Sequence, residues 1–343
     1  MSNTDIAAHA PPRASDINVP TLATELPWLA AAVAGCLALT FAFTGNSFAL
    51  NILATAFLFG GLATAWNIIG GLGGQFSLGH SVFFAIGAYT TGNVVLGYAL
   101  SPWLALVPGM AMAAAFGAAV SWPVFRLRGP FFAIATMALT EVMLALAMYF
   151  ESITGGAPGL SIPFKLGFAN MIFRDRMSYA FLMLGFLAVT LLVFAIIRHS
   201  RLGYSLQAIR DNEDTAEAAG IDVLRSKLVA MAISAALTAA GGCLYIMYVR
   251  VVDPPSLFSL FDVGVKIALI ALIGGIGTTY GPLLGALLII PLENYLRAEM
   301  GGVFPGSNLI VLGAILVVTA LYLRKGVFGA ASSLVGSWRS KRQ

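Results

Sequence analysis

The chain has 343 residues, of which 59% are hydrophobic and only 10% are charged. Soluble globular proteins carry roughly 25% charged residues, and the mean hydropathy of +0.89 places this chain among integral membrane proteins. The formal net charge of +4 is small and gives no support for nucleic-acid binding. Two cysteines, Cys36 and Cys243, lie in apolar runs and form neither a disulfide framework nor a metal-ligand spacing.

Residues 1–26 are polar and contain proline, without the basic-then-apolar pattern of a secretory signal, which predicts a disordered cytoplasmic tail. Beyond this tail, apolar runs predict an all-α polytopic membrane protein with roughly 8 to 10 transmembrane helices. The predicted spans are 27–44, 48–69, 81–99, 102–125, 130–150, 178–197, 227–249, 263–276, 282–296 and 306–323. Together they form a transmembrane domain over residues 27–323.

The distribution of basic residues predicts the orientation, because lysine and arginine collect in the inner segments of membrane proteins. With the N-terminus inside, thirteen of them fall in inner segments and five in outer segments, and Lys266 lies within a span. We therefore expect both termini to be cytoplasmic (N-in, C-in). Residues 151–177 then form a periplasmic loop, which is either a docking surface or an ordinary connection, and 324–343 form a basic cytoplasmic tail.

Two glycine clusters, 70–74 and 274–277, interrupt the apolar pattern. The spans flanking the second cluster are short, so 263–276 and 282–296 either cross fully or enter and return as broken, re-entrant segments. Glycine-interrupted segments in the two halves of a transporter point to a substrate path, whereas small residues equally permit close helix packing. Both interpretations stay open. The candidate path residues at these clusters are Gln75, Ser77, His80, Gly275 and Gly277.

Placing an ionisable residue within a membrane span costs free energy, so we expect each such residue to have a structural or functional role. Glu141 lies midway along its span and is expected either to make a structural hydrogen bond or to contact the substrate. Lys266 follows Asp262 by four residues, a helical pairing distance, and is expected to snorkel toward it. Glu293 and Arg297 repeat that spacing and predict a surface pair.

Catalytic chemistry finds little support in the sequence. The chain lacks a GxxxxGK[ST] phosphate-binding loop, so we do not expect it to hydrolyse ATP by itself. Ser77 and His80 lie three residues apart, but no nearby carboxylate would orient the histidine for nucleophilic catalysis. His80 is instead expected to cap or hydrogen-bond near the start of the following helix. We expect a protein that is not an enzyme and that binds no cofactor.

A charged stretch, 198–226, separates two long apolar runs and is the most informative part of the chain. Residues 204–219 favour helix, and Gly220 supplies a C-terminal stop. The alanines of 216–220 offer a small, smooth surface. This pattern predicts a cytoplasmic helix that sits in a groove on another protein and passes force into the attached spans.

At this loop the chain resembles the permeases of bacterial ATP-binding-cassette importers, whose coupling loop places a glutamate and two alanines before a glycine. Glu217, Ala218, Ala219 and Gly220 match this pattern, although the glycine follows sooner than in its widest form. Other stretches resemble LivM-type branched-chain amino acid permeases, in order from about residue 60 to 323. These stretches are 74–80 with 88–89, 127–141, 208–222 and 274–286.

The resemblance implies a permease subunit of an importer in the bacterial inner membrane. It assigns ATPase coupling to Arg210 together with the four residues 217–220. It also implies a second related permease, two ATPase subunits that use ATP, and a periplasmic solute-binding protein. Lys266 stands where the family often has an acidic or neutral residue, and it would suit an anionic solute. Urea, short amides or aromatic acids are therefore alternative substrates, and an ion-coupled secondary transporter is an alternative mechanism.

Overall fold

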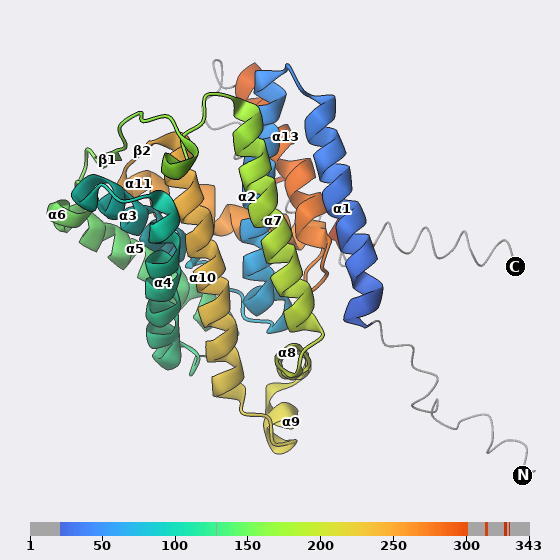
Figure 1. Cartoon of the computed structure of the whole chain (residues 1–343). Helices are drawn as coiled ribbons and strands as arrows, with labels where there is room; N and C mark the ends of the chain where they lie inside the picture. Colours follow the sequence, from blue (N-terminus) through green and yellow to red (C-terminus); the bar gives the residue numbers. More distant parts are fainter. Residues whose placement is uncertain (1–20, 128, 301–312, 315–325, 328, 330–343) are drawn as a thin grey trace, which may run out of the picture.

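The computed structural model describes residues 21–127, 129–300, 313–314, 326–327 and 329 (Figure 1). Nearly all of the described chain is helical, and long helices run side by side through the bundle. The elements in chain order are α1 (Leu22–Ala42), α2 (Ser47–Asn67), η3 (Ile68–Leu72), α3 (His80–Tyr98), α4 (Pro102–Val124), α5 (Pro130–Tyr149), α6 (Glu151–Thr154), β1 (Leu160–Ser161), η4 (Phe168–Asn170), α7 (Arg176–Arg198), α8 (Arg201–Asp211), α9 (Glu213–Ala218), α10 (Val223–Val249), β2 (Val251–Val252), α11 (Pro254–Leu257), η5 (Leu260–Val265), α12 (Lys266–Gly274) and α13 (Gly281–Met300).

Seven segments of the described chain are long and apolar enough to cross a membrane, which confirms the predicted all-α polytopic architecture. These segments are Leu22–Ala42, Ser47–Leu72, Pro102–Val124, Pro130–Tyr149, Arg176–Arg198, Val223–Val249 and Pro254–Gly274. Helices α3 and α13 add 19 and 20 residues to the bundle. The predicted span 306–323 lies almost entirely outside the described residues, as do the tail up to residue 20 and nearly all of 324–343.

Two faces of the bundle serve as references. The α8–α9 face carries these two short helices, and the β1–β2 face carries the antiparallel pair in which Leu160 lies opposite Val252 (Figure 1). The predicted short span 263–276 is only the end of a longer segment, because α11, η5 and α12 continue one another from β2 toward the α8–α9 face. The chain then turns through 275–280 and returns in α13. The first of these segments, Pro254–Gly274, is therefore long and apolar enough to cross a membrane.

Helices α2 and α10 form the centre of the bundle, where residues 56–67 and 237–244 are buried. Small residues let neighbouring helices approach this centre closely, as is usual in membranes. A Cβ on Gly87 of α3 would collide with the Ala239 carbonyl of α10, and one on Gly117 of α4 would lie 3.0 Å from Ala235. The α4 face that packs here repeats a small residue every four positions: Ala105, Gly109, Ala113, Gly117 and Ser121.

Two predicted boundaries are wrong because charged residues lie inside helices. Helix α1 begins at Leu22 rather than at residue 27, and its first turn contains Glu25, which is compensated by Arg198 at 3.2 Å. Helix α10 begins at Val223, within the predicted loop 198–226, and its first turns include Lys227. In both cases the charge is paired by another element, so it does not end the helix.

Both ends of the described chain lie at the α8–α9 face. The Glu25 carbonyl near the start of α1 accepts a hydrogen bond from the Tyr280 hydroxyl at 3.2 Å. Gly326 lies beside the same loop, since a Cβ on it would be 2.5 Å from the Gly275 Cα atom. A topology with both ends on one side of the membrane requires this arrangement.

Candidate functional site

The polar stretch on the α8–α9 face forms two helices, so the single helix predicted over 204–219 is wrong. Asn212 is extended, with φ −161° and ψ 112°, and its side chain accepts a hydrogen bond from the backbone N–H of Thr215 at 2.9 Å. An asparagine in this conformation caps a new helix rather than continuing the old one. The predicted stop at Gly220 is confirmed, because its φ is +86° just after the C-cap of α9.

Helix α9 is attached to the bundle by one apolar side chain and one ion pair. Ala216 is buried, and Glu213 Oε2 lies 2.8 Å from the Nζ atom of Lys227 in α10. The Lys227 side chain is only 2% exposed, so this pair holds α9 firmly against α10. Sequence reasoning missed it. The coupling residues expected at 217–220 are all exposed, which leaves that surface free in this chain.

Helix α8 lies against the end of α2. Its buried residues Gly203, Leu206 and Ile209 form one face, and Leu206 packs with the isoleucines of η3. Gly203 has no room for a side chain, because a Cβ there would collide with the Ile197 carbonyl at the end of α7. The glycine therefore allows the tight corner that turns α8 from α7 onto the bundle.

Arg210, at the end of α8, joins the two glycine clusters. Its Nη1 donates to the Gly71 carbonyl at 3.1 Å. A Cβ on Gly277 would lie 3.1 Å from the same nitrogen, and a Cβ on Gly74 would lie 2.7 Å from Arg210 Cγ. The guanidinium therefore fills the space that these glycines leave. The two glycine clusters, 70–74 and 274–277, are therefore in physical contact, which favours the packing interpretation of Gly277.

Asn67 completes the junction between the clusters and was not identified from the sequence. Its Oδ1 accepts from the Gly277 N–H at 2.8 Å, and its Nδ2 donates to the Thr278 carbonyl at 2.9 Å. The sequence feature that could have identified Asn67 is a polar residue inside the apolar run of α2. Gly275 and Gly277 have φ values of +130° and +74°, so both need glycine to form the loop that Asn67 grips.

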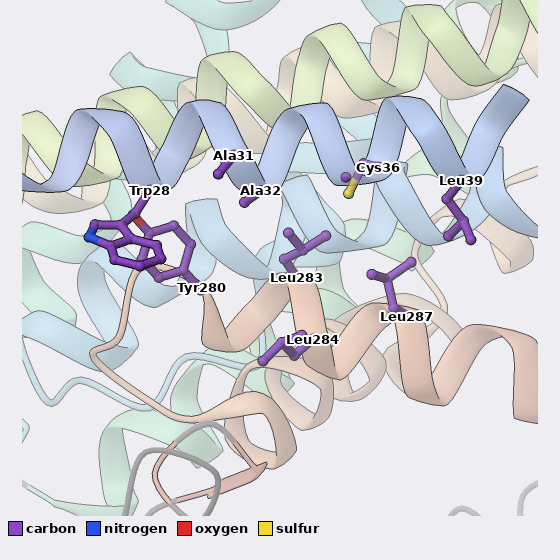
Figure 2. A pocket seen from close by; sticks show the side chains of 10 residues that line it. Trp28, Ala31, Ala32, Cys36, Leu39, Tyr280, Leu283, Leu284 and Leu287 are labelled. Atoms are coloured by element: carbon purple, nitrogen blue, oxygen red, sulfur yellow. The ribbon is translucent and has the colours of Figure 1, made fainter. Parts of the chain in front are cut away.

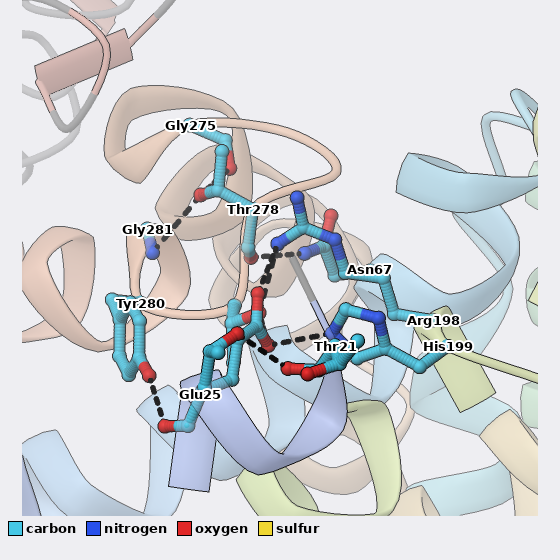
Figure 3. Close-up of polar contacts among 11 residues, drawn as sticks. Thr21, Glu25, Asn67, Arg198, His199, Gly275, Thr278, Tyr280 and Gly281 are labelled. Atoms are coloured by element: carbon cyan, nitrogen blue, oxygen red, sulfur yellow. Dashed lines mark hydrogen bonds and ion pairs between the residues drawn. The ribbon is translucent and has the colours of Figure 1, made fainter. Parts of the chain in front are cut away.

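A polar cluster fastens α1 to this same junction (Figure 3). Glu25 lies 3.2 Å from both Arg198 Nη1 and His199 Nε2, and it accepts from the Thr279 hydroxyl at 3.2 Å. Arg198 also donates to Thr279 at 3.0 Å. Burial and the Glu25 carboxylate raise the pKa of Tyr280 above its ordinary value, with Arg198 opposing the shift. Three helix ends therefore meet at the loop 275–280.

The segment 73–79, which lies between the predicted spans 48–69 and 81–99, enters the bundle as non-helical chain, and the predicted span 81–99 corresponds to α3. His80, which begins α3, contacts Ser234, about 16 Å along α10 from its first residue. This is roughly half of a 30 Å hydrocarbon layer. Non-helical backbone at such depth is tolerated only where protein buries it or water lines it. Trp66 Nε1 donates to the Ser77 carbonyl at 2.6 Å, and the Leu78 N–H donates to the Thr136 hydroxyl at 3.0 Å.

His80 forms hydrogen bonds at the start of α3, one of its two predicted roles, and does not cap the helix: it is fully buried and both ring nitrogens are hydrogen-bonded. Nε2 lies 2.9 Å from Ser234 Oγ, and Nδ1 lies 3.1 Å from Ser77 Oγ. The Ser234 hydroxyl donates its hydrogen bond to the Ala65 carbonyl at 2.7 Å, so its oxygen must accept a hydrogen bond from the Nε2–H of His80. His80 and Ser77 therefore hold the non-helical segment in place. Gln75 is half-buried within it.

Lys266 forms a buried ion pair that sequence reasoning missed. Its Nζ lies 2.8 Å from Glu293 Oε1 and 3.9 Å from Asp262 Oδ1, and its side chain is 10% exposed. The predicted surface pair between Glu293 and Arg297 forms at 2.8 Å, but the Glu293 side chain is only 4% exposed. The predicted pairing of Lys266 with Asp262 is therefore present, but the lysine side chain stays buried and lies closer to Glu293 on α13.

Glu141 lies on an exposed face of α5. It makes no hydrogen bond or ion pair within the described part of the chain, so the expected structural hydrogen bond is not formed there. Among the candidate path residues, a side-chain hydrogen bond joins Ser77 and His80, whereas Glu141 and Lys266 lie on different helices, α5 and α12.

A groove between α1 and α13 has a volume of about 460 Å³ (Figure 2). Figure 2 shows small α1 side chains, Ala31 and Ala32, facing the leucines 283, 284 and 287 of α13. An apolar surface of this kind gives a charged or zwitterionic solute nothing to replace its water. The groove is therefore a poor candidate for the solute path.

Comparison with known protein families identifies the family of this chain. A family model described as "Branched-chain amino acid transport system / permease component" matches residues 48–320. The chain belongs to this family. The match begins with α2 and continues through α13, so it contains both glycine clusters and the α8–α9 unit but leaves out α1.

Relatives in this permease family carry two related names. The high-affinity branched-chain amino acid transport system permease protein LivM of Escherichia coli K12 is 31% identical over 290 residues, which cover 78% of this chain and 66% of the relative. A probable LivM of Methanocaldococcus jannaschii is 29% identical, covering 71% and 70%. The LivH permease protein of Escherichia coli K12 is 23% identical, covering 78% and 90%. The chain thus spans just under two thirds of the E. coli LivM, and no solved structure matches it.

Proposed function

We propose that this chain is a permease subunit of an ATP-binding-cassette importer that moves branched-chain amino acids, or a related small solute, across the bacterial inner membrane. The chain itself would bind no cofactor, and ATP would be used by partner subunits. Membership of a transport permease family supports this proposal, as does a polar two-helix unit on one face of a membrane bundle. The observation on which the proposal depends most is the contact between Arg210 and Gly71, because this contact links the two-helix unit to the glycine clusters.

Force applied to the α8–α9 unit has two routes into the bundle. The exposed surface 217–220 would dock on an ATPase, and the pair Glu213–Lys227 would transmit its movement to α10. Arg210 would transmit it to the end of α2 and to the loop 275–280. Such coupling changes the pore only if ATP and the delivery protein bind its inward- and outward-facing states unequally.

The solute path would run beside the non-helical segment 73–79, where Gln75 is half-buried and Phe76 is 40% exposed. Non-helical chain at mid-membrane depth needs water or protein beside it, and a second related permease would supply the other wall. Two ATPase subunits would bind the α8–α9 faces. A periplasmic solute-binding protein would dock over 151–177, which is pinned to β2 by the Leu160–Val252 pairing.

The test is assembly and uptake with candidate partner subunits. Glu217→Lys reverses a charge on the exposed docking surface, and we expect it to abolish both ATPase co-purification and uptake. Glu151→Lys is the matched control for ATPase co-purification alone, since Glu151 is also exposed but lies in α6 at the β1–β2 face. Normal co-purification and uptake by Glu217→Lys would contradict the proposal. Loss of uptake on adding an uncoupler, with ATP held constant, would favour an ion-coupled transporter instead.

A further inference from the structure

Glu141 lies near the middle of a membrane-spanning helix. It is the twelfth of the 20 residues of α5. At 1.5 Å per residue, its Cα lies about 17 Å from the start of the helix and about 12 Å from its end. The hydrocarbon layer is about 30 Å thick, so Glu141 cannot reach either interface, and a carboxylate at this depth facing lipid would be strongly disfavoured.

Two other charged side chains in the helices of the described chain, Lys266 and Glu25, have charged partners. Lys266 is paired with Glu293 at 2.8 Å, and Glu25 with Arg198 at 3.2 Å. Glu141 has no such partner among the described residues. The contrast indicates that its partner lies outside the described residues.

Glu141 also points away from its own chain. The buried residues of α5, Phe132, Thr136, Thr140 and Ala147, form one stripe. At 100° per residue, Glu141 lies about 135° round the helix from the centre of that stripe. Its exposed neighbours on this outer face, Ala138 and Ala145, are three residues before and four after it. Their small side chains leave the carboxylate open to whatever faces α5.

We propose that Glu141 lines a water-filled path between this chain and a second permease and binds the ammonium group of the solute at mid-membrane. This rests on the proposed function and names the chemical class of its substrate. A carboxylate forms its strongest hydrogen bonds with charged donors. Lys266 does not offset this negative charge, because Glu293 neutralises it. Solutes that carry an ammonium group are therefore favoured over purely anionic ones, which reverses the expectation drawn from Lys266 alone.

The first test measures whether water reaches this position in the assembled transporter. Cys36 and Cys243 are both buried, so a single introduced cysteine can be followed. Glu141→Cys is compared with Val189→Cys, which lies in the middle of α7, is 55% exposed and has the exposed apolar neighbours Leu192 and Ile196. We expect a water-soluble, positively charged thiol reagent to modify Cys at 141 at least about tenfold faster, because the hydrocarbon layer excludes such a reagent. Equal, slow modification at both positions would overturn the proposal.

The second test measures uptake by the complete transporter. Glu141→Gln keeps the shape and removes the charge, and we expect about tenfold slower uptake of a zwitterionic amino acid, the scale of one lost charge-assisted hydrogen bond. Glu141→Asp should restore most of the rate. Wild-type uptake by Glu141→Gln would overturn the proposal while leaving ATP-driven transport intact. Failure of the wild-type complex to couple uptake to ATP would instead contradict the proposed function. If Glu141→Gln does not assemble, the modification rate of Cys at 141 decides.

Discussion

Replacing Arg210 by methionine removes the guanidinium between the glycine clusters while keeping a side chain of similar length. The lost interactions are a charged hydrogen bond of 3.1 Å to the Gly71 carbonyl and a contact of 3.4 Å with exposed Asp211, of which only the first reaches a glycine cluster. Such bonds contribute about 1.5–3 kcal/mol, and because the Arg210 side chain is 38% exposed, we expect about 1–2 kcal/mol here. If this energy couples the α8–α9 unit to the pore, its loss weakens the coupling by roughly 5- to 30-fold.

The assay is the ratio of solute transported to ATP hydrolysed, measured in proteoliposomes that contain the complete transporter. We expect Arg210→Met to retain ATP hydrolysis and to lose most transport per ATP. Arg201→Met is the control, because Arg201 is exposed on the same helix and has no side-chain hydrogen bond or ion pair in the described structure. If both variants keep the wild-type ratio, the reasoning about Arg210 is refuted.

Three further predictions concern stability. Lys266→Met leaves buried Glu293 with only an exposed partner and should destabilise the detergent-solubilised protein by about 2–3 kcal/mol; an unchanged melting temperature would contradict the burial of this pair. Gly71→Ala places a Cβ 2.7 Å from the Gly277 nitrogen and should reduce folded yield, whereas a normal yield would show that the clusters can separate. Hydrogen bonds in the first turn of α7 hold the pKa of Asp175 below its ordinary value of 3.8, so this cap stabilises above that pH and is lost as the pH falls through the lowered pKa. Asp175→Asn should therefore remove part of the acid sensitivity of unfolding, and identical acid profiles would argue against the cap.

The spans were predictable because their apolar length is a local property of the chain. Local pairs four residues apart were equally readable, as Glu293 and Arg297 show. The Lys266–Glu293 and Lys227–Glu213 pairs were not, because each joins helices whose packing the sequence does not specify. A charged residue with no opposite charge nearby in the sequence can therefore still form an ion pair in the fold.

The helix break at Asn212 was hidden for a different reason. The residues on both sides favour helix, so propensity summed over 204–219 predicts one continuous element. An asparagine side chain that captures the Thr215 N–H outweighs that preference at a single position. The segment 73–79 lay outside the predicted spans, but its place in the bundle could not be predicted, since its hydrogen bonds come from Trp66 on α2 and Thr136 on α5.

The central claim, that an ATPase acts on this chain through the α8–α9 unit, is tested most directly by photo-crosslinking. A photo-reactive amino acid at Ala218, which is exposed at the end of α9, should form an adduct with the ATP-binding subunit in the assembled transporter. The same probe at Ala169, exposed in η4 of the loop 151–177, should not. An ATP-binding subunit that attaches to position 169 and not to 218 would contradict the account.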